Sequence, residues 1–289
     1  MDIALALVAA FFFALGFVLQ EKAASKLPAD SVGAGFLVRL AHQPVWLLGA
    51  AAQVAGFVVQ AIALGIGRMV IVQPLLITTI VFALPLGRLI EKRTITRNEW
   101  LGATIVTVGL GTLLLVSKTD EGTDDAPLAR WALIGGITVG IAVVLFLAAQ
   151  SRAPTVRAAL LGTAGGILFG LAAALTKTVV SSLDEGVGSV AGSWQLYVMV
   201  AVSVAAFWLE QAALQTGALA AAVATTMAFD PLSSLVFGVV LFDEALHETA
   251  LGITVSLLSL AATLSGLVLL ARAKQREAEP PGAPALAPA

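Results

Sequence analysis

The chain of 289 residues contains no cysteine, and only 12% of its residues are charged. The lack of cysteine excludes disulfide bonds and thiolate metal sites. Together with a hydrophobic content of 59%, the scarcity of charge excludes a soluble globular domain, in which about 25% of residues are charged. Histidine occurs only twice, and no HExxH or GxSxG motif is present, so we expect no enzyme, no catalytic residues and no cofactor. The net charge of −2 argues against a nucleic-acid partner.

Long apolar segments make up most of the sequence. A transmembrane helix needs roughly 20 mainly apolar residues. Nine segments qualify, at about 3–20, 45–66, 69–90, 99–117, 131–149, 157–181, 195–216, 218–242 and 249–271. Their connections are short, so we predict an all-α integral membrane protein, a polytopic bundle of nine transmembrane helices. The short apolar stretch 31–40 is expected to form a half-helix or interfacial helix; if it crosses the membrane, the count becomes ten.

The distribution of Lys and Arg predicts the orientation. Twelve of the 16 basic residues would lie on one side of the bundle and three on the other, with Lys177 inside a span. Cytoplasmic loops carry an excess of Lys and Arg, so the richer side, with the C-terminus, is expected to be cytoplasmic and the protein to be a multi-pass protein of the plasma membrane. The proline-rich composition of 272–289 predicts a disordered cytoplasmic tail. The opposite loops, which include Asp243 and Glu244, are acidic and are expected to be solvated.

An internal repeat divides the chain. The segment FVVQAIALGIG (57–67) aligns with FWLEQAALQTG (207–217), and Leu101-Gly102 aligns with Leu251-Gly252 at the same offset. We therefore predict a first four-span repeat in 1–118, a linker with one transmembrane helix in 119–154 and a second four-span repeat in 155–271. One linking span means that the second repeat enters the membrane from the opposite side. Such inverted repeats are typical of secondary transporters, whose binding sites lie near the midplane at the repeat interface.

Several features occur in an order that resembles a known group. A glycine-bearing first helix ends in Lys22, the helix 45–66 ends in an A-L-x-x-G pattern, a proline-bearing helix follows with Glu91 after it, and the last helix of the repeat has an L-G pair. This order resembles the drug/metabolite transporter (DMT, EamA-like) superfamily over residues 2–271. The nine spans and the stretch VVQAIALGIGRMVIVQPL are most similar to the NIPA magnesium transporter family. The resemblance implies a transporter, with Mg²⁺ as its substrate.

Asp230 is the strongest candidate for a binding residue. It lies at the centre of the predicted span 218–242, where a carboxylate costs about 2.5–3.5 kcal/mol on insertion scales. The following Pro231 is expected to kink the helix and expose carbonyl groups. Thr225 and Thr226 lie about one turn earlier, so that carboxylate, hydroxyl and carbonyl oxygens would offer ligands to a hard cation.

A second acid, Glu210, lies in the predicted span 195–216 and could bind a cation or carry a proton, or reach the inner interface. Its repeat partner is the neutral Gln60, which could also bridge helices by hydrogen bonds. Lys177 is expected to reach the membrane interface or to act as a counter-charge for either acid. The remaining candidates for substrate binding beside Glu210 are Trp208 and Gln211. The GxxxGxxxG motif of Gly162, Gly166 and Gly170 is expected to serve close helix packing.

These residues favour a membrane transporter that moves a small solute by alternating access. Mg²⁺ or another divalent cation is the leading substrate, with Asp230 and Glu210 as metal ligands. A proton-coupled exporter of a small metabolite or cationic drug is the alternative, and a membrane enzyme or scaffold is a reading from another class. The expected partners are the lipid bilayer and the transported solute, and a homodimer stays open.

Overall fold

The structure is a computed structural model that describes residues 1–24, 42–91, 94–116, 122–216, 218–244 and 250–278. Within these ranges every regular element is a helix. The elements are α1 (Asp2–Ala24), α3 (Pro44–Ile66), α4 (Met69–Leu76), α5 (Thr78–Glu91), α6 (Arg97–Val116), α7 (Leu128–Ala149), α8 (Pro154–Ser181), a 3-10 turn (Ser182–Glu185), α9 (Val187–Gly192), α10 (Trp194–Leu214), α11 (Leu219–Phe242) and α12 (Ala250–Ala278). The all-α class is therefore confirmed.

Seven helices of the described residues are long and apolar enough to cross a membrane, which makes the chain a membrane protein. They comprise α1, α3, the combined α4 and α5, α7, α8, α10 and α11. The other two predicted spans, 99–117 and 249–271, correspond to α6 and α12. The predicted half-helix 31–40 lies outside the described residues. α12 continues to Ala278, so the first residues of the predicted tail are helical, and the remainder of the tail lies outside the described residues.

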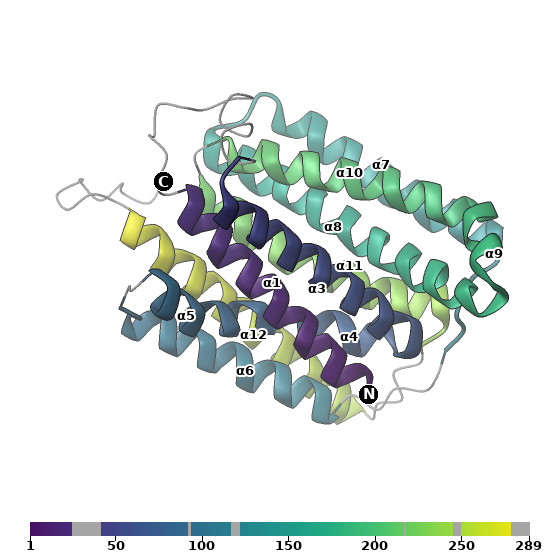
Figure 1. Cartoon of the computed structure of the whole chain (residues 1–289), viewed down its shortest axis with the longest axis horizontal. Helices are drawn as coiled ribbons and strands as arrows, with labels where there is room; N and C mark the ends of the chain where they lie inside the picture. The colour runs from purple at the N-terminus through teal and green to yellow at the C-terminus, as the bar shows by residue number, and fades with distance from the viewer. Residues whose placement is uncertain (25–41, 92–93, 117–121, 217, 245–249, 279–289) are drawn as a thin grey trace.

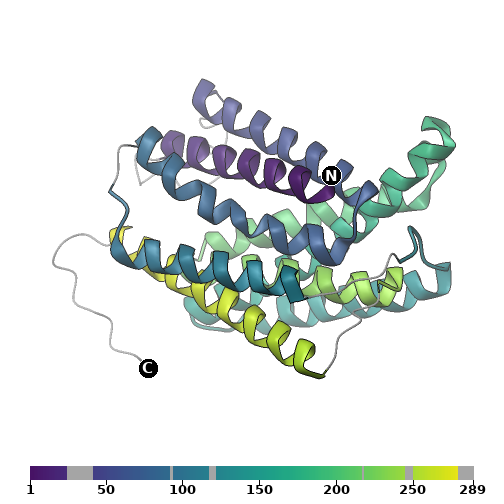
Figure 2. The same cartoon turned by 90° about the horizontal axis from the view of Figure 1, so that it is seen from below.

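Helix α8 is the most buried of the seven spans and forms the centre of the second half of the chain. It packs mainly against α10 and α11, with α7 on another side. In the first half, α1 packs mainly against α3 and against α4 and α5, while α6 pairs with α12. Figure 1 shows α7 and α10 along one edge of the bundle and α6 and α12 along the opposite edge, and Figure 2 shows the same layers from below.

The glycine motif of α8 lets α11 approach closely. A methyl group on Gly166 would lie 2.7 Å from the carbonyl oxygen of Thr226 and 3.0 Å from the backbone nitrogen of Asp230. A methyl group on Gly162 or Gly170 would also meet α11. The predicted packing role of this motif is confirmed, and the same packing fixes the position of Asp230 against α8.

The proline-bearing helices differ from the prediction. α11 is a continuous α-helix from Leu219 to Phe242 with Pro231 inside it, so the expected break beside Asp230 is absent from this described helix. The break lies instead in the first half, at Ile77, where α4 gives way to α5 three residues after Pro74. The Ile77 N–H donates to the Pro74 carbonyl at 3.1 Å, a tighter turn than in an α-helix. Proline removes a backbone donor in both helices, but neighbouring helices support α11 through that position.

The close contact between α8 and α11 gives a first prediction. In Gly166→Ala the added methyl group overlaps the α11 backbone, and we expect the free energy of unfolding to fall by about 1–3 kcal/mol. Thermal unfolding in detergent measures this change. Gly136→Ala in α7 is the matched control, because a methyl group there would meet nothing within 4 Å. Equal midpoints for the two variants would contradict the packing described.

Candidate functional site

A buried ion pair joins three helices at one end of the bundle. Glu244, two residues after α11, has a fully buried side chain, and its Oε1 accepts a hydrogen bond from Lys177 Nζ at 2.6 Å. The same carboxylate accepts the backbone N–H groups of Met69 and Val70, each at 2.8 Å. These are the first residues of α4, so Glu244 caps that helix at its positive end. One carboxylate thus connects α8, α11 and the start of α4.

Aromatic rings and loop contacts enclose this pair. Lys177 Nζ lies 4.7 Å from the centre of the Phe242 ring, which packs edge to face with Trp131. Arg130 forms an ion pair with Asp243 at 2.8 Å and also donates to carbonyls at the end of α11. The acids at this end therefore do not all behave as a solvated loop. Glu244 is buried and paired, contrary to the prediction, whereas Asp243 is exposed as predicted.

The sequence led us to expect that Lys177 acts as a counter-charge for Asp230 or Glu210, but the described residues show no ion pair between Lys177 and either acid. Lys177 is buried in α8, and Glu244 is the acid that it contacts. A lysine inside a span requires a counter-charge. The acidic residues immediately after 218–242 were possible partners for Lys177. Because they are far from Lys177 in the chain, the sequence alone does not show that they lie beside it.

The side chain of Asp230 presents a buried, unpaired oxygen. Its Oδ1 has no hydrogen-bond partner, and neither does the buried hydroxyl of Ser234, one turn further along α11. The third such atom among the described residues is Nε2 of Gln73, in α4. A buried polar group without a partner costs about 1–3 kcal/mol. Such groups require an explanation, and an absent polar ligand is one.

Packing between α4 and α11 places these three residues near one level of the bundle. α4 begins where α11 ends, so the two helices run in opposite directions. Gly238 of α11 lies against Val70 of α4. One turn from this contact, α4 carries Gln73 and α11 carries Ser234, and Asp230 follows one turn later. Ser234 was missed in the sequence, because only the pairing of the helices brings it to the level of Gln73.

Glu210 lies on the other side of α8 at the level of Asp230. Gly165 of α8 faces the backbone of Glu210, and the adjacent Gly166 faces the backbone of Asp230. No ion pair between either carboxylate and a basic side chain is found within the described part of the chain. The structure therefore brings together the two acids that the sequence selected.

Two other candidates are placed differently. The Thr226 hydroxyl donates to the Gly162 carbonyl at 3.2 Å, and so it ties α11 to α8. Gln60 lies in α3 near the Lys177 end of the bundle, because Gly65 of α3 meets Val180 of α8. Gly165 of α8, which faces Glu210, lies 15 residues before Val180, and Gln60 lies five residues before Gly65. At a rise of 1.5 Å per residue, Gln60 is therefore about 15 Å from the level of Glu210 along the bundle. The structure does not bring Gln60 to the two acids.

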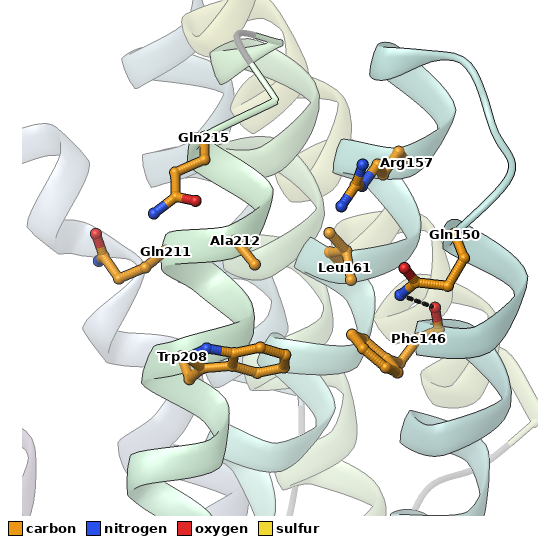
Figure 3. Close-up of a pocket in the computed structure, with 8 residues that line it drawn as sticks. All are labelled: Phe146, Gln150, Arg157, Leu161, Trp208, Gln211, Ala212 and Gln215. Atoms are coloured by element: carbon orange, nitrogen blue, oxygen red, sulfur yellow. Dashed lines mark hydrogen bonds between the residues drawn. The ribbon is translucent and has the colours of Figure 1, made fainter. Parts of the chain in front are cut away.

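The last two candidates, Trp208 and Gln211, line a separate pocket of about 270 Å³ between α7, α8 and α10 (Figure 3). The remaining lining residues are Phe146, Gln150, Arg157, Leu161, Ala212 and Gln215. Trp208 is 55% exposed and stacks at a tilt against Phe146, with ring centres 5.5 Å apart. Neither Asp230 nor Glu210 lines this pocket.

Over the described residues, no group of three or more His, Cys, Asp or Glu side chains could hold a metal ion. Mg²⁺ commonly keeps several waters and binds through one or two carboxylates. Asp230 and Glu210 supply two carboxylates and so do not form such a group of three.

Comparison with known proteins gives one relative. The chain is 26% identical over 243 residues to a protein of Corynebacterium glutamicum described only as uncharacterized, and 83% of each chain is covered. No protein-family model matches the chain. No solved structure matches it either.

The ion pair gives a second prediction. Lys177→Met leaves a buried carboxylate without its cation and Glu244→Gln leaves a buried lysine, so each should lower the free energy of unfolding by about 3–5 kcal/mol. The double variant should lose at least about 1 kcal/mol less than the sum of the two. A double-mutant cycle of thermal unfolding measures this coupling.

Arg130→Gln is the control for that cycle. It removes a cation whose partner, Asp243, is 58% exposed. An exposed pair contributes about 0–1 kcal/mol, so this variant should unfold near the wild-type midpoint. Strict additivity in the Lys177 and Glu244 cycle would contradict the pairing.

Proposed function

We propose that this protein is a membrane transporter that moves a small cation by alternating access, with Asp230 and Glu210 at its binding site. The observation that carries the proposal is the buried, unpaired Oδ1 of Asp230 in the middle of a membrane helix. In contrast, the two acids whose side chains are buried, Glu99 and Glu244, both accept hydrogen bonds. An ionisable residue inside a membrane bundle is a candidate functional residue, and one without a cationic partner is suited to a cation that binds reversibly.

The packing of the two halves supports an inverted repeat within a nine-span bundle. α1 packs on α3 and on α4 with α5, as α8 packs on α10 and α11. Lys22 near the end of α1 donates to the Ile90 carbonyl at the end of α5, as Lys177 in α8 bonds beside the end of α11. A buried polar residue precedes a proline in both central helices, Gln73 in α4 and Asp230 in α11. In transporters with inverted repeats, the site lies where the two halves meet.

A divalent cation, Mg²⁺ in particular, is the substrate that this site favours. Its potential ligands are the carboxylate oxygens of Asp230 and Glu210 and the hydroxyl oxygen of Ser234, the types that hard cations prefer. The order of sequence motifs that resembles the drug/metabolite transporters and the NIPA family supports the same assignment. The distribution of Lys and Arg supports a plasma-membrane protein with its C-terminus in the cytoplasm.

Proton-coupled export of a cationic metabolite is the second candidate. It is favoured by the closeness of Asp230 and Glu210 without a basic partner in the described part of the chain. Two such carboxyl groups could exchange protons for an organic cation. A pH gradient distinguishes this mechanism from simple cation transport.

Flux into liposomes tests the proposal. The purified protein should carry Mg²⁺ or another divalent cation, and Asp230→Asn should reduce the initial rate at least about tenfold, because it removes the charge that binds the ion. Glu210→Gln should reduce the rate less. Organic cations, assayed with and without a pH gradient, form the parallel series.

Asp243→Asn is the matched control for the flux assay. It also replaces one aspartate by asparagine, but at an exposed position with positive φ, a conformation that asparagine tolerates. Its flux should equal that of the wild type. Transport that survives Asp230→Asn unchanged would contradict the proposed site, and transport of organic cations alone, driven by a pH gradient, would favour the second candidate.

A further inference from the structure

A second polar site lies at the end of the bundle where α7 is connected to α8. It is the pocket of about 270 Å³ shown in Figure 3. Arg157 reaches it from the first turns of α8, Gln150 from the end of α7, and Gln211 and Gln215 from the end of α10. The acids of the proposed transport site do not line it, so it requires an explanation of its own.

The pocket is positively charged. Arg157 is its one charged lining residue, and no hydrogen bond or ion pair to this side chain occurs in the described residues. The other polar lining groups are neutral amides, of which Gln150 donates to the Phe146 carbonyl at 3.1 Å. A guanidinium with amide donors around it matches an anion that has several oxygen atoms, above all a phosphate.

The floor of the pocket is apolar and continues onto a surface that faces lipid. Phe146 and Trp208 pack together below the polar groups (Figure 3). One turn deeper, Val143 of α7 is 49% exposed and Val204 of α10 is 63% exposed. α7 and α10 are also the two least buried of the seven spans. The site therefore has a polar end at the helix termini and an apolar groove that extends toward the middle of the membrane.

We propose that this pocket binds an anionic phospholipid, with Arg157 on the phosphate of the headgroup and an acyl chain along Val143 and Val204. The polar groups lie above an apolar groove, and this arrangement favours a lipid over a soluble anion. A soluble phosphate would make no favourable contact with the aromatic floor or the exposed valines. Basic pockets between transmembrane helices bind anionic headgroups by the same chemistry. Binding here bridges α7 and α10, which otherwise meet mainly through α8.

Native mass spectrometry of the detergent-purified full chain tests the site. With phosphatidylglycerol we expect one tightly retained lipid per protein, and weaker retention of phosphatidylcholine. Arg157→Gln should weaken retention of phosphatidylglycerol about tenfold, because it removes a charge-assisted contact. Arg157 has no protein partner among the described residues, so the variant should unfold at the wild-type temperature in lipid-free detergent.

Arg152→Gln is the matched control. It removes the same charge from the same end of the bundle, and its side chain is exposed like that of Arg157, but it does not line the pocket. It should retain the lipid as the wild type does. Equal losses in the two arginine variants would overturn the proposal in favour of general surface charge, as would the absence of a retained lipid. Displacement of phosphatidylglycerol by inorganic phosphate at millimolar concentration would assign the pocket to a soluble anion instead.

Discussion

The carboxylate of Glu244 is the group on which the arrangement of the central helices depends. It accepts two backbone N–H groups at the start of α4 and the ammonium group of Lys177 in α8, while its own backbone follows α11. In a bilayer, helix ends and charges cannot be left without partners. One buried residue satisfies the positive end of a helix and a buried cation together, and it fixes the position of α4 against the second half of the chain.

This anchoring makes the contrast with Asp230 informative. α4 is held at one end by Glu244, and deeper in the bundle it carries the unpaired amide of Gln73 toward the level of Ser234 and Asp230. The α8 glycines meanwhile allow α10 and α11 to approach, so that Glu210 and Asp230 lie at one level. In the described residues, Glu244 at the end of the bundle is thus paired completely, whereas Asp230 and Glu210 inside the bundle have no basic partner. We interpret the first as a structural contact and the second as a site.

Much of this architecture could be predicted from local sequence. Length and apolarity identify the spans because the bilayer sets both, and the i, i+4 spacing of Gly162, Gly166 and Gly170 predicts close packing because it places all three on one helix face. Asp230 and Glu210 could be selected because charge inside an apolar segment is rare. Their neighbourhood could be predicted only in part, since Gln73 and Ser234 join it through the pairing of α4 with α11.

Other predictions from the sequence were wrong for physical reasons. Glu244 follows an apolar helix and resembles a loop acid, because its three partners lie 67 to 175 residues away in the chain. Pro231 removes a hydrogen bond but does not break α11, since packing against α8 supports the helix through that point. Local sequence shows neither which residue pairs with a buried charge nor which neighbouring helices support a helix that contains proline. Both depend on which helices become neighbours.

The proposed transport requires that the level of Ser234 and Asp230 becomes accessible to water and binds a cation. Since the chain has no cysteine, Ser234→Cys introduces a single thiol at a position that is fully buried in the structure. Its labelling by a membrane-impermeant thiol reagent, applied to liposomes with and without Mg²⁺, tests that claim most directly. The account predicts slow labelling that millimolar Mg²⁺ suppresses. A thiol that never reacts from either side, or that reacts at the same rate with and without every divalent cation tested, would contradict it.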